Sequence, residues 1–199
     1  PERYVGTRAP IEEAVPLPPE VYFSEEWYDR EVETIFRREW LVATRVEEIP
    51  NPGDYVRLDI VDEPLVILRD DDGVIRALSA SCRHRGSELM TGSGNCRRIT
   101  CPYHAWSYSL DGELVATPNV AKEELDRMAF PLHRVAVESW QGMLFVSLAT
   151  DPPPLVDWLA ESSDEILSFE RLQLDRLRLG RLETSTVAAN WKILVENYA

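Results

Sequence analysis

The sequence predicts a mainly β protein, with one compact all-β domain over residues 40–150 and helices on either side. Three observations predict this fold class. Short runs rich in β-branched and aromatic residues, separated by turn signals, fill the middle of the chain. A helical apolar pattern precedes them, and the sequence Asp151-Pro-Pro-Pro follows them as a boundary.

Residues 1–39 are predicted to form an N-terminal arm and a helix. The first 23 residues are rich in proline and are interpreted as an extended arm. Ser24 is a suitable N-cap, and acidic residues follow it while arginines come near the end, as the helix dipole favours. We therefore expect an amphipathic helix over residues 24–39.

The central domain shows the alternation of strands and tight turns. The turn signals are Asn51-Pro-Gly-Asp, Asp71-Asp-Gly and Asp111-Gly, of which the last is a strong hairpin signal. The clearest strand candidates are Tyr55–Ile60, Leu65–Arg69 and Met143–Leu148. Together they predict an all-β domain.

Residues 151–199 are interpreted as a linker helix and the start of a further domain. The apolar spacing predicts a helix over residues 155–171. Residues 175–187 are expected to form one strand, with a bulge at Gly180 where the apolar parity changes. A new helix is expected from Asn190 onward. It runs to Ala199 without a stop signal, and the chain opens on Pro1, so both ends look cut.

Charge and composition exclude several classes of partner. The chain has 21 Lys and Arg against 35 Asp and Glu, a net charge of −14, which would repel nucleic acids and anionic membranes. No run approaches the ~18 apolar residues that a membrane span needs, and no signal peptide opens the sequence. We expect a cytoplasmic protein.

Two short motifs pair a cysteine with a histidine: Cys82-Arg-His84 and Cys101-Pro-Tyr-His104. Three cysteines in a chain of 199 residues do not make a disulfide framework, so these pairs indicate metal. Thiolates favour ferric iron in a sulfide-bridged cluster, and imidazoles suit an iron that becomes ferrous. A structural Cys2His2 zinc site is the alternative, although C-x-H is tighter than the usual spacing of zinc ligands.

The motifs C-x-H-R-G and C-P-Y-H-x-W resemble the Rieske domain of the ring-hydroxylating, non-haem iron oxygenase alpha subunits. The resemblance implies a [2Fe–2S] cluster in an antiparallel β-sandwich, followed here by the truncated start of an α+β catalytic domain. It also implies that Cys82 and Cys101 bind one iron and that His84 and His104 bind the other.

Residues around the motifs refine this resemblance. Respiratory Rieske proteins carry an extra disulfide, and Ser87 and Tyr103 stand at its two positions here. Trp106 replaces a serine that donates a hydrogen bond to the cluster, which implies a low-potential cluster. Arg85, Tyr103 and Trp106 are expected to surround the ligands. Ala105 stands where the family usually has glycine, a change that a small side chain should tolerate.

The segment Asn190-Trp191-Lys192 with Glu196-Asn197-Tyr198 resembles the opening of the oxygenase catalytic domain. The resemblance implies that Asn197 lies near a mononuclear Fe(II), held by two histidines and a carboxylate further along the chain. It also implies a homotrimer that receives electrons from a reductase, a ferredoxin or both.

The histidine count limits what this chain does alone. It has three histidines, of which the motifs use two, and His133, expected to be structural, cannot build the iron site by itself. We therefore expect no catalytic residues and no oxygenase activity here. The predicted function is electron delivery, within an oxygenase alpha subunit, to Fe(II) for O₂-dependent hydroxylation of an aromatic or quaternary-amine substrate. A stand-alone Rieske ferredoxin is the alternative. Cys96 is expected to be an idle thiol.

Overall fold

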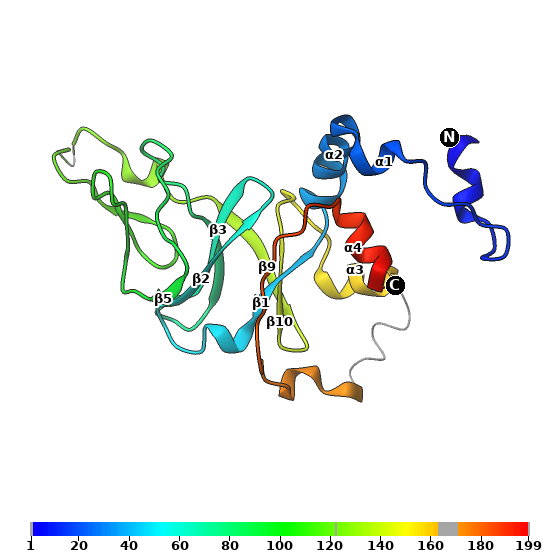
Figure 1. The fold of residues 1–199 in the computed structure, drawn as a ribbon. Helices are drawn as coiled ribbons and strands as arrows, with labels where there is room; N and C mark the ends of the chain where they lie inside the picture. The colour runs from blue at the N-terminus through cyan, green and yellow to red at the C-terminus, as the bar shows by residue number, and fades with distance from the viewer. Residues whose placement is uncertain (1, 122, 163–170, 199) are drawn as a thin grey trace. The chain divides into compact units, whose positions relative to one another are not determined.

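The computed structural model describes residues 2–121, 123–162 and 171–198 of the chain (Figure 1). Its contacts divide the chain into two compact units. One unit comprises Phe36–Arg178, and the other combines Pro1–Ile35 with Leu179–Ala199. The predicted domain boundaries at residues 39 and 150 separate residues 151–178 from the β domain, whereas the contacts group them with it. The predicted domain bounds stay a prediction.

The unit Phe36–Arg178 is built on a seven-stranded sheet of described residues, in the order β1-β10-β9-β4-β3-β2-β5, with every paired strand antiparallel. Its strands are β1 (Leu41–Arg45), β2 (Asp54–Ile60), β3 (Glu63–Arg69), β4 (Ile75–Ser79), β5 (Ser93–Asn95), β9 (Arg134–Trp140) and β10 (Met143–Ser147). The predicted antiparallel, mainly β fold is confirmed, and the three strongest strand candidates correspond to β2, β3 and β10.

Strand β3 shows why the sequence has a continuous apolar run here. Leu65 and Ile67 pack into a core on one face of the sheet, and Val66 and Leu68 pack into a second core on the other face. A strand that is covered on both faces needs apolar residues at every position. The run therefore marks the strand that lies between the two cores.

A second, three-stranded sheet covers one of these cores. It consists of β6 (Ile99–Thr100), β7 (Ser107–Tyr108) and β8 (Leu114–Ala116), in that order. The turn between β7 and β8 contains Asp111-Gly112, so the predicted hairpin is confirmed. The segment that carries this small sheet, drawn in green in Figure 1, packs against the face of the large sheet formed by Val66, Leu68 and Leu78.

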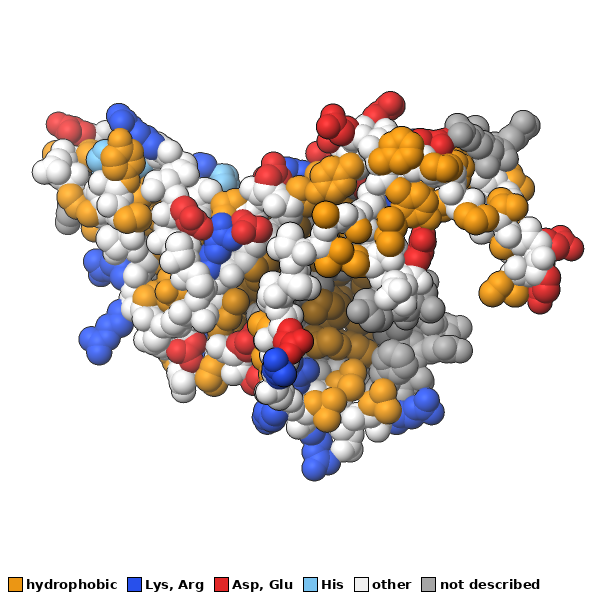
Figure 2. Space-filling model, viewed as in Figure 1, with side chains coloured by type: hydrophobic (Ala, Val, Ile, Leu, Met, Phe, Trp, Pro, Cys, Tyr) orange, Lys and Arg blue, Asp and Glu red, His pale blue; other side chains and the backbone are white. Residues whose placement is uncertain are grey.

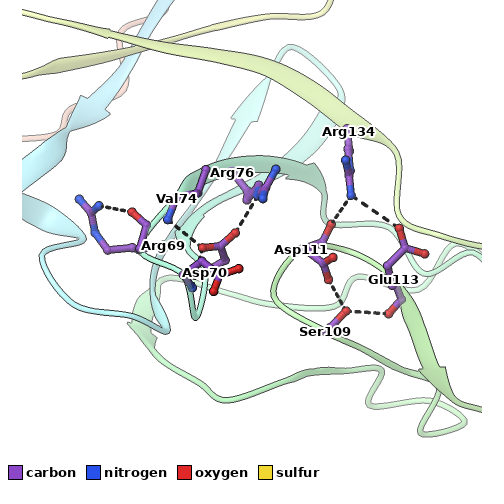
Figure 3. Close-up of polar contacts among 10 residues, drawn as sticks. Arg69, Asp70, Val74, Arg76, Ser109, Asp111, Glu113 and Arg134 are labelled. Atoms are coloured by element: carbon purple, nitrogen blue, oxygen red, sulfur yellow. Dashed lines mark hydrogen bonds and ion pairs between the residues drawn. The ribbon is translucent and has the colours of Figure 1, made fainter.

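Polar side chains in the turns of this unit hydrogen-bond to neighbouring backbone and side chains and so stabilise the hairpins (Figure 3). Buried Asp70 accepts hydrogen bonds from the backbone of Asp72 and Val74, and it pairs with Arg76 at 2.8 Å. Arg134 donates to the carbonyl of Asp111 at 3.3 Å and lies 3.6 Å from the carboxylate of Glu113. These contacts connect the loops between strands to the strands themselves.

Helix α3 (Leu155–Ser162) packs on the large sheet through Leu155 and Leu159, which are buried with Trp40 and Phe145. The first half of the predicted helix 155–171 is thus confirmed, and residues 163–170 lie outside the described residues. Short helical turns complete the unit: η3 (Val46–Glu48), η4 (Arg127–Ala129) and η6 (Leu174–Arg176). Among the described helices, none is both long enough and apolar enough to cross a bilayer.

The predicted strand 175–187 is wrong. Residues 174–176 form the turn η6, and residues 177–187 have no regular structure. Leu177, Leu179 and Leu182 are 54%, 43% and 72% exposed, so the alternating apolar side chains of this segment are not buried in a core. A period-two pattern makes a strand only where a neighbouring strand accepts its hydrogen bonds, and this segment pairs with none of the described strands.

The other unit contains the N-terminal helices η1 (Glu2–Arg8), α1 (Glu20–Phe23), α2 (Glu25–Glu31) and most of η2 (Val32–Phe36), together with α4 (Trp191–Tyr198). The hydroxyl of Ser24 accepts a hydrogen bond from the backbone of Trp27, so the predicted N-cap is confirmed. The helix from Asn190 onward is also confirmed, since α4 begins at Trp191.

Two predictions for the N-terminal segment need correction. The arm is not wholly extended, because η1 forms before the first internal proline, Pro10, and α1 begins directly after Pro19, which caps it with helical backbone angles. The helix 24–39 ends early: α2 passes into the π-helical turn η2, and regular helix stops at Phe36.

Candidate metal centre

The loop that carries Cys82 and His84 is a closed turn. The backbone N–H of Gly86 donates to the carbonyl of Cys82 at 2.8 Å, and the N–H of Cys82 donates to the carbonyl of Ser87 at 2.9 Å. An isolated bridge between Ser81 and Glu88 holds the two ends of the loop together. These backbone contacts close the loop.

The second loop repeats this hydrogen-bond pattern. The N–H of Ala105 donates to the carbonyl of Cys101 at 3.0 Å, and the N–H of Cys101 donates to the carbonyl of Trp106 at 2.8 Å. The fifth residue has a positive φ in both loops, 68° at Gly86 and 57° at Ala105. The left-handed backbone at position 105 explains why the family usually has glycine there, because a side chain disfavours this conformation.

The two cysteine sulfurs lie inside the core, each residue being 3% exposed. Burial alone would raise the pKa of Cys101. Its sulfur, however, accepts hydrogen bonds from the backbone N–H groups of His104 and Tyr103 and from the side chains of Cys82 and Ser87. Together they lower the pKa of the thiol. This surrounding favours thiolate, the form that binds iron.

The two imidazoles form a second pair at the surface of the unit. The ring centroids of His84 and His104 are 4.8 Å apart, and the rings meet edge to face at 66°. Partial desolvation and the neighbouring His104 and Arg85 lower the pKa of His84, which favours its neutral ring. His104 Nδ1 is buried and has no hydrogen-bond partner among the described residues. A buried ring nitrogen without a hydrogen-bond partner at His104 fits a metal ligand, and so does the favoured neutral ring of His84.

The four side chains are therefore arranged as a sulfur pair and an imidazole pair. In the described part of the chain, no three His, Cys, Asp or Glu side chains converge on one point. Two separate pairs suit two metal ions, each with two protein ligands, as in a cluster whose irons are ligated unequally. The residues present thus fit a [2Fe–2S] group.

Comparisons with known proteins agree with this geometry. Residues 39–141, about half of the chain, match the Rieske [2Fe-2S] domain family. The chain belongs to this family. It is 38% identical over 182 residues to a glycine betaine monooxygenase oxygenase subunit of Chromohalobacter salexigens, covering 91% of this chain and 40% of that protein. It is 32% identical over 191 residues to a carnitine monooxygenase oxygenase subunit of Escherichia coli, covering 94% and 50%.

Solved structures give the same assignment. The quaternary ammonium Rieske monooxygenase CntA with L-carnitine matches with a TM-score of 0.85 at 33% identity, over 93% of this chain and 53% of that one. Naphthalene 1,2-dioxygenase from a Rhodococcus species matches with a TM-score of 0.83 at 31% identity, over 92% and 43%. The chain spans about half or less of these relatives, and its resemblance to the Rieske-containing part of oxygenase alpha subunits is confirmed.

The residues expected around the Rieske motifs lie at different depths. Trp106 is 6% exposed and stacks on the ring of His84, with centroids 4.7 Å apart and planes at 9°. Tyr103 is 61% exposed, and its ring lies 3.7 Å from that of His104. Arg85 is exposed beside His84. Trp106 therefore covers one histidine from the core, and Tyr103 covers the other from outside.

Tyr108 has a specific contact that the sequence did not reveal. It is completely buried, its hydroxyl lies 3.4 Å from Cys82 Sγ, and the backbone N–H of Arg83 donates to it at 3.0 Å. Burial raises the pKa of this phenol well above its usual value, so the hydroxyl keeps its proton for the sulfur. Its position two residues after Trp106, which is also buried, was the available signal.

The remaining histidine and cysteine of the Rieske domain lie outside the sulfur pair and the imidazole pair. His133 is exposed, and Arg83 Nη1 lies 2.7 Å from its Nε2, so it contacts the first loop. Cys96 is half-buried against the core that contains Cys82 and Cys101, and burial raises the pKa of its thiol. All three cysteines are free.

Asn197 belongs to the other compact unit. It lies exposed on α4, which carries the segment Asn190–Tyr198 that resembles the start of the catalytic domain. The chain's three histidines all lie in the unit Phe36–Arg178. The expected place of Asn197 near a mononuclear iron stays a prediction.

Proposed function

We propose that Cys82, Cys101, His84 and His104 hold the [2Fe–2S] cluster of this Rieske domain, with both sulfurs on one iron and both imidazoles on the other. The observation that carries the proposal is the division of these side chains into a buried thiol pair and a histidine pair on two loops with the same backbone hydrogen-bond pattern. When bound, such a cluster accepts and releases one electron at a time.

The surroundings of the ligands suit this role. The sulfur pair is enclosed by the core, which excludes water from one side of the centre. His84 is exposed and His104 is half-buried, so the imidazole pair provides the short path to the surface. The hydrogen bond from Tyr108 and the backbone donors at Cys101 stabilise negative charge on sulfur, which tunes the reduction potential.

We further propose that the chain is the electron-delivering part of an oxygenase alpha subunit that works in the cytoplasm as a homotrimer. A reductase, a ferredoxin or both would supply electrons, and a mononuclear Fe(II) outside this chain would receive them. Relatives about twice as long, named as oxygenase subunits, support this proposal. This chain alone is expected to lack oxygenase activity.

For the substrate we propose a quaternary amine. The support comes from relatives named for glycine betaine and carnitine, and from the CntA structure in complex with L-carnitine. Naphthalene 1,2-dioxygenase components also match, so an aromatic substrate is the competing outcome. Substrate-dependent O₂ uptake by the complete subunit with its reductase, compared for glycine betaine, carnitine and naphthalene, distinguishes the two classes.

Metal analysis of the purified chain tests the cluster itself. We expect two irons and two acid-labile sulfides per chain, a red-brown colour, and a rhombic EPR signal after reduction. A single zinc ion per chain, without labile sulfide, would refute the cluster and return the site to the zinc alternative.

A further inference from the structure

Helix α4 is attached to its unit by polar contacts. Trp191 Nε1 donates to Glu31 Oε2 at 2.8 Å, and Lys192 Nζ donates to Glu31 Oε1 at 2.5 Å. One carboxylate of α2 thus holds two consecutive residues at the beginning of α4. Ile193, Leu194 and Val195 are 45%, 40% and 56% exposed, so none of these apolar side chains is buried in the attachment.

The contact between Glu31 and Lys192 is desolvated. Their side chains are 9% and 13% exposed. A buried ion pair has well-defined geometry, and loss of one partner leaves an uncompensated charge in a poorly hydrated place. The carboxylate is therefore suited to fix the position of α4.

Aromatic rings complete the surroundings of Lys192. Its Nζ lies 5.9 Å from the ring centroid of Tyr22 and 5.3 Å from that of Trp191, within the range of cation–π attraction. One turn further along α4, Tyr22 donates a hydrogen bond to Glu196 at 2.7 Å. Both parts of the segment Asn190–Tyr198 are thus held by the N-terminal helices, over which hydrophobic side chains gather in Figure 2.

The helix changes its geometry directly after Glu31. Helix α2 ends at this residue, and the π-helical turn η2 begins at Val32. Such turns are uncommon in proteins and occur frequently at functional sites. The position of the carboxylate thus coincides with a local departure from the ordinary helix.

We propose that Glu31 is a positioning residue, whose buried carboxylate sets the orientation of α4 and, through it, of Asn197. This inference rests on the proposed function for its consequence at the mononuclear iron. The contacts that fix α4 lie within this chain. The position of α4 and its effect on the iron can therefore be tested separately.

The first test uses the chain of 199 residues and the indole N–H of Trp191, observed by ¹⁵N NMR and assigned with Trp191→Phe. In Glu31→Gln, an amide nitrogen competes with the indole and the Lys192 ammonium for one acceptor. We expect hydrogen exchange of the indole to become at least tenfold faster. Adding Lys192→Met removes the unpaired ammonium and should restore most of the protection.

The matched control is Glu25→Gln, an exposed carboxylate on the same helix, which should leave the exchange unchanged. If Lys192→Met restores the protection in Glu31→Gln, the loss came from the broken charge pair. If Glu31→Gln had instead loosened the unit in general, Lys192→Met would increase the exchange further. Equal exchange in the wild type and Glu31→Gln would overturn the proposed positioning.

The second test uses the complete oxygenase subunit, with ferrous iron and nitric oxide as probes and the cluster kept oxidised. We expect Glu31→Gln to bind Fe(II) at least fivefold more weakly, Lys192→Met to restore part of the loss, and Glu25→Gln to match the wild type. Equal Fe(II) affinity in the wild type and Glu31→Gln would overturn the inference at the iron. A wild-type subunit that binds no Fe(II) would refute the proposed function instead, and the exchange test would still decide the role of Glu31.

Discussion

The imidazole rings of His84 and His104 lie 4.8 Å apart although the two residues are 20 positions apart in the sequence. Two loops with the same backbone hydrogen bonds bring them together, and the same loops place the thiols of Cys82 and Cys101 in the core. The pairing therefore belongs to the backbone of the Rieske domain and should persist when a single ligand is replaced.

Replacement of His84 by cysteine should keep a cluster but change its character. A third thiolate adds negative charge, so the midpoint potential should fall by at least about 100 mV, toward the range of all-cysteine clusters. Redox titration followed by EPR measures this shift. His133→Gln is the matched control, because His133 contacts the loop without belonging to either proposed ligand pair. The midpoint potential of this variant should stay within a few tens of millivolts of the wild type.

Replacement of Tyr108 by phenylalanine should lower the midpoint potential with little change in the absorption spectrum. The hydroxyl lies 3.4 Å from Cys82 Sγ and stabilises the additional negative charge of the reduced state. A hydrogen bond of about 1 kcal/mol corresponds to about 40 mV for one electron. Tyr28→Phe, which removes an exposed hydroxyl in the other unit, should not shift the potential. An unchanged potential in Tyr108→Phe would show that this hydroxyl does not act on the cluster.

Replacement of Ala105 by glycine should raise the thermal stability of the chain. Ala105 has a φ of 57°, where a Cβ costs about 1–2 kcal/mol, and the greater freedom of glycine in the unfolded chain offsets part of the gain. We expect a net gain of about 0.5–1 kcal/mol, or about 1–4 °C in Tm. Ala116→Gly in β8, where φ is negative, should lower Tm instead.

Removal of the Asp70 carboxylate should strongly destabilise the β3–β4 hairpin. Asp70 is 3% exposed and accepts bonds from two backbone N–H groups and Arg76, so Asp70→Ala leaves these donors unsatisfied. We expect a loss of about 3 kcal/mol, measured by thermal unfolding under anaerobic conditions. Asp71→Ala, on the exposed side of the same turn, should cost less than about 0.5 kcal/mol.

The sequence predicted those features whose cause is local. The apolar run of β3, the Ser24 cap and the Asp111-Gly112 turn depend on neighbouring residues, and all three were confirmed. The strand over residues 175–187 failed because an alternating pattern does not reveal whether a neighbouring strand exists.

Long-range contacts explain what the sequence could not provide. Lys192 and Glu31 are 161 positions apart, and Tyr108 is 26 positions from Cys82, so no spacing rule connects them. The positive φ of Ala105 was also hidden, because only the folded loop shows why the family prefers glycine there. Of these residues, Tyr108 and Ala105 lie beside the cysteines and histidines that the motifs had indicated.

The most direct test of the central claim is electron–nuclear double resonance on the reduced chain labelled with ¹⁵N-histidine. Binding of one iron by His84 and His104 predicts two strongly coupled ¹⁵N nuclei, a single one in His84→Cys or His104→Cys, and two in His133→Gln. A reduced cluster without histidine nitrogen coupling, or with the coupling lost in His133→Gln, would contradict the assignment.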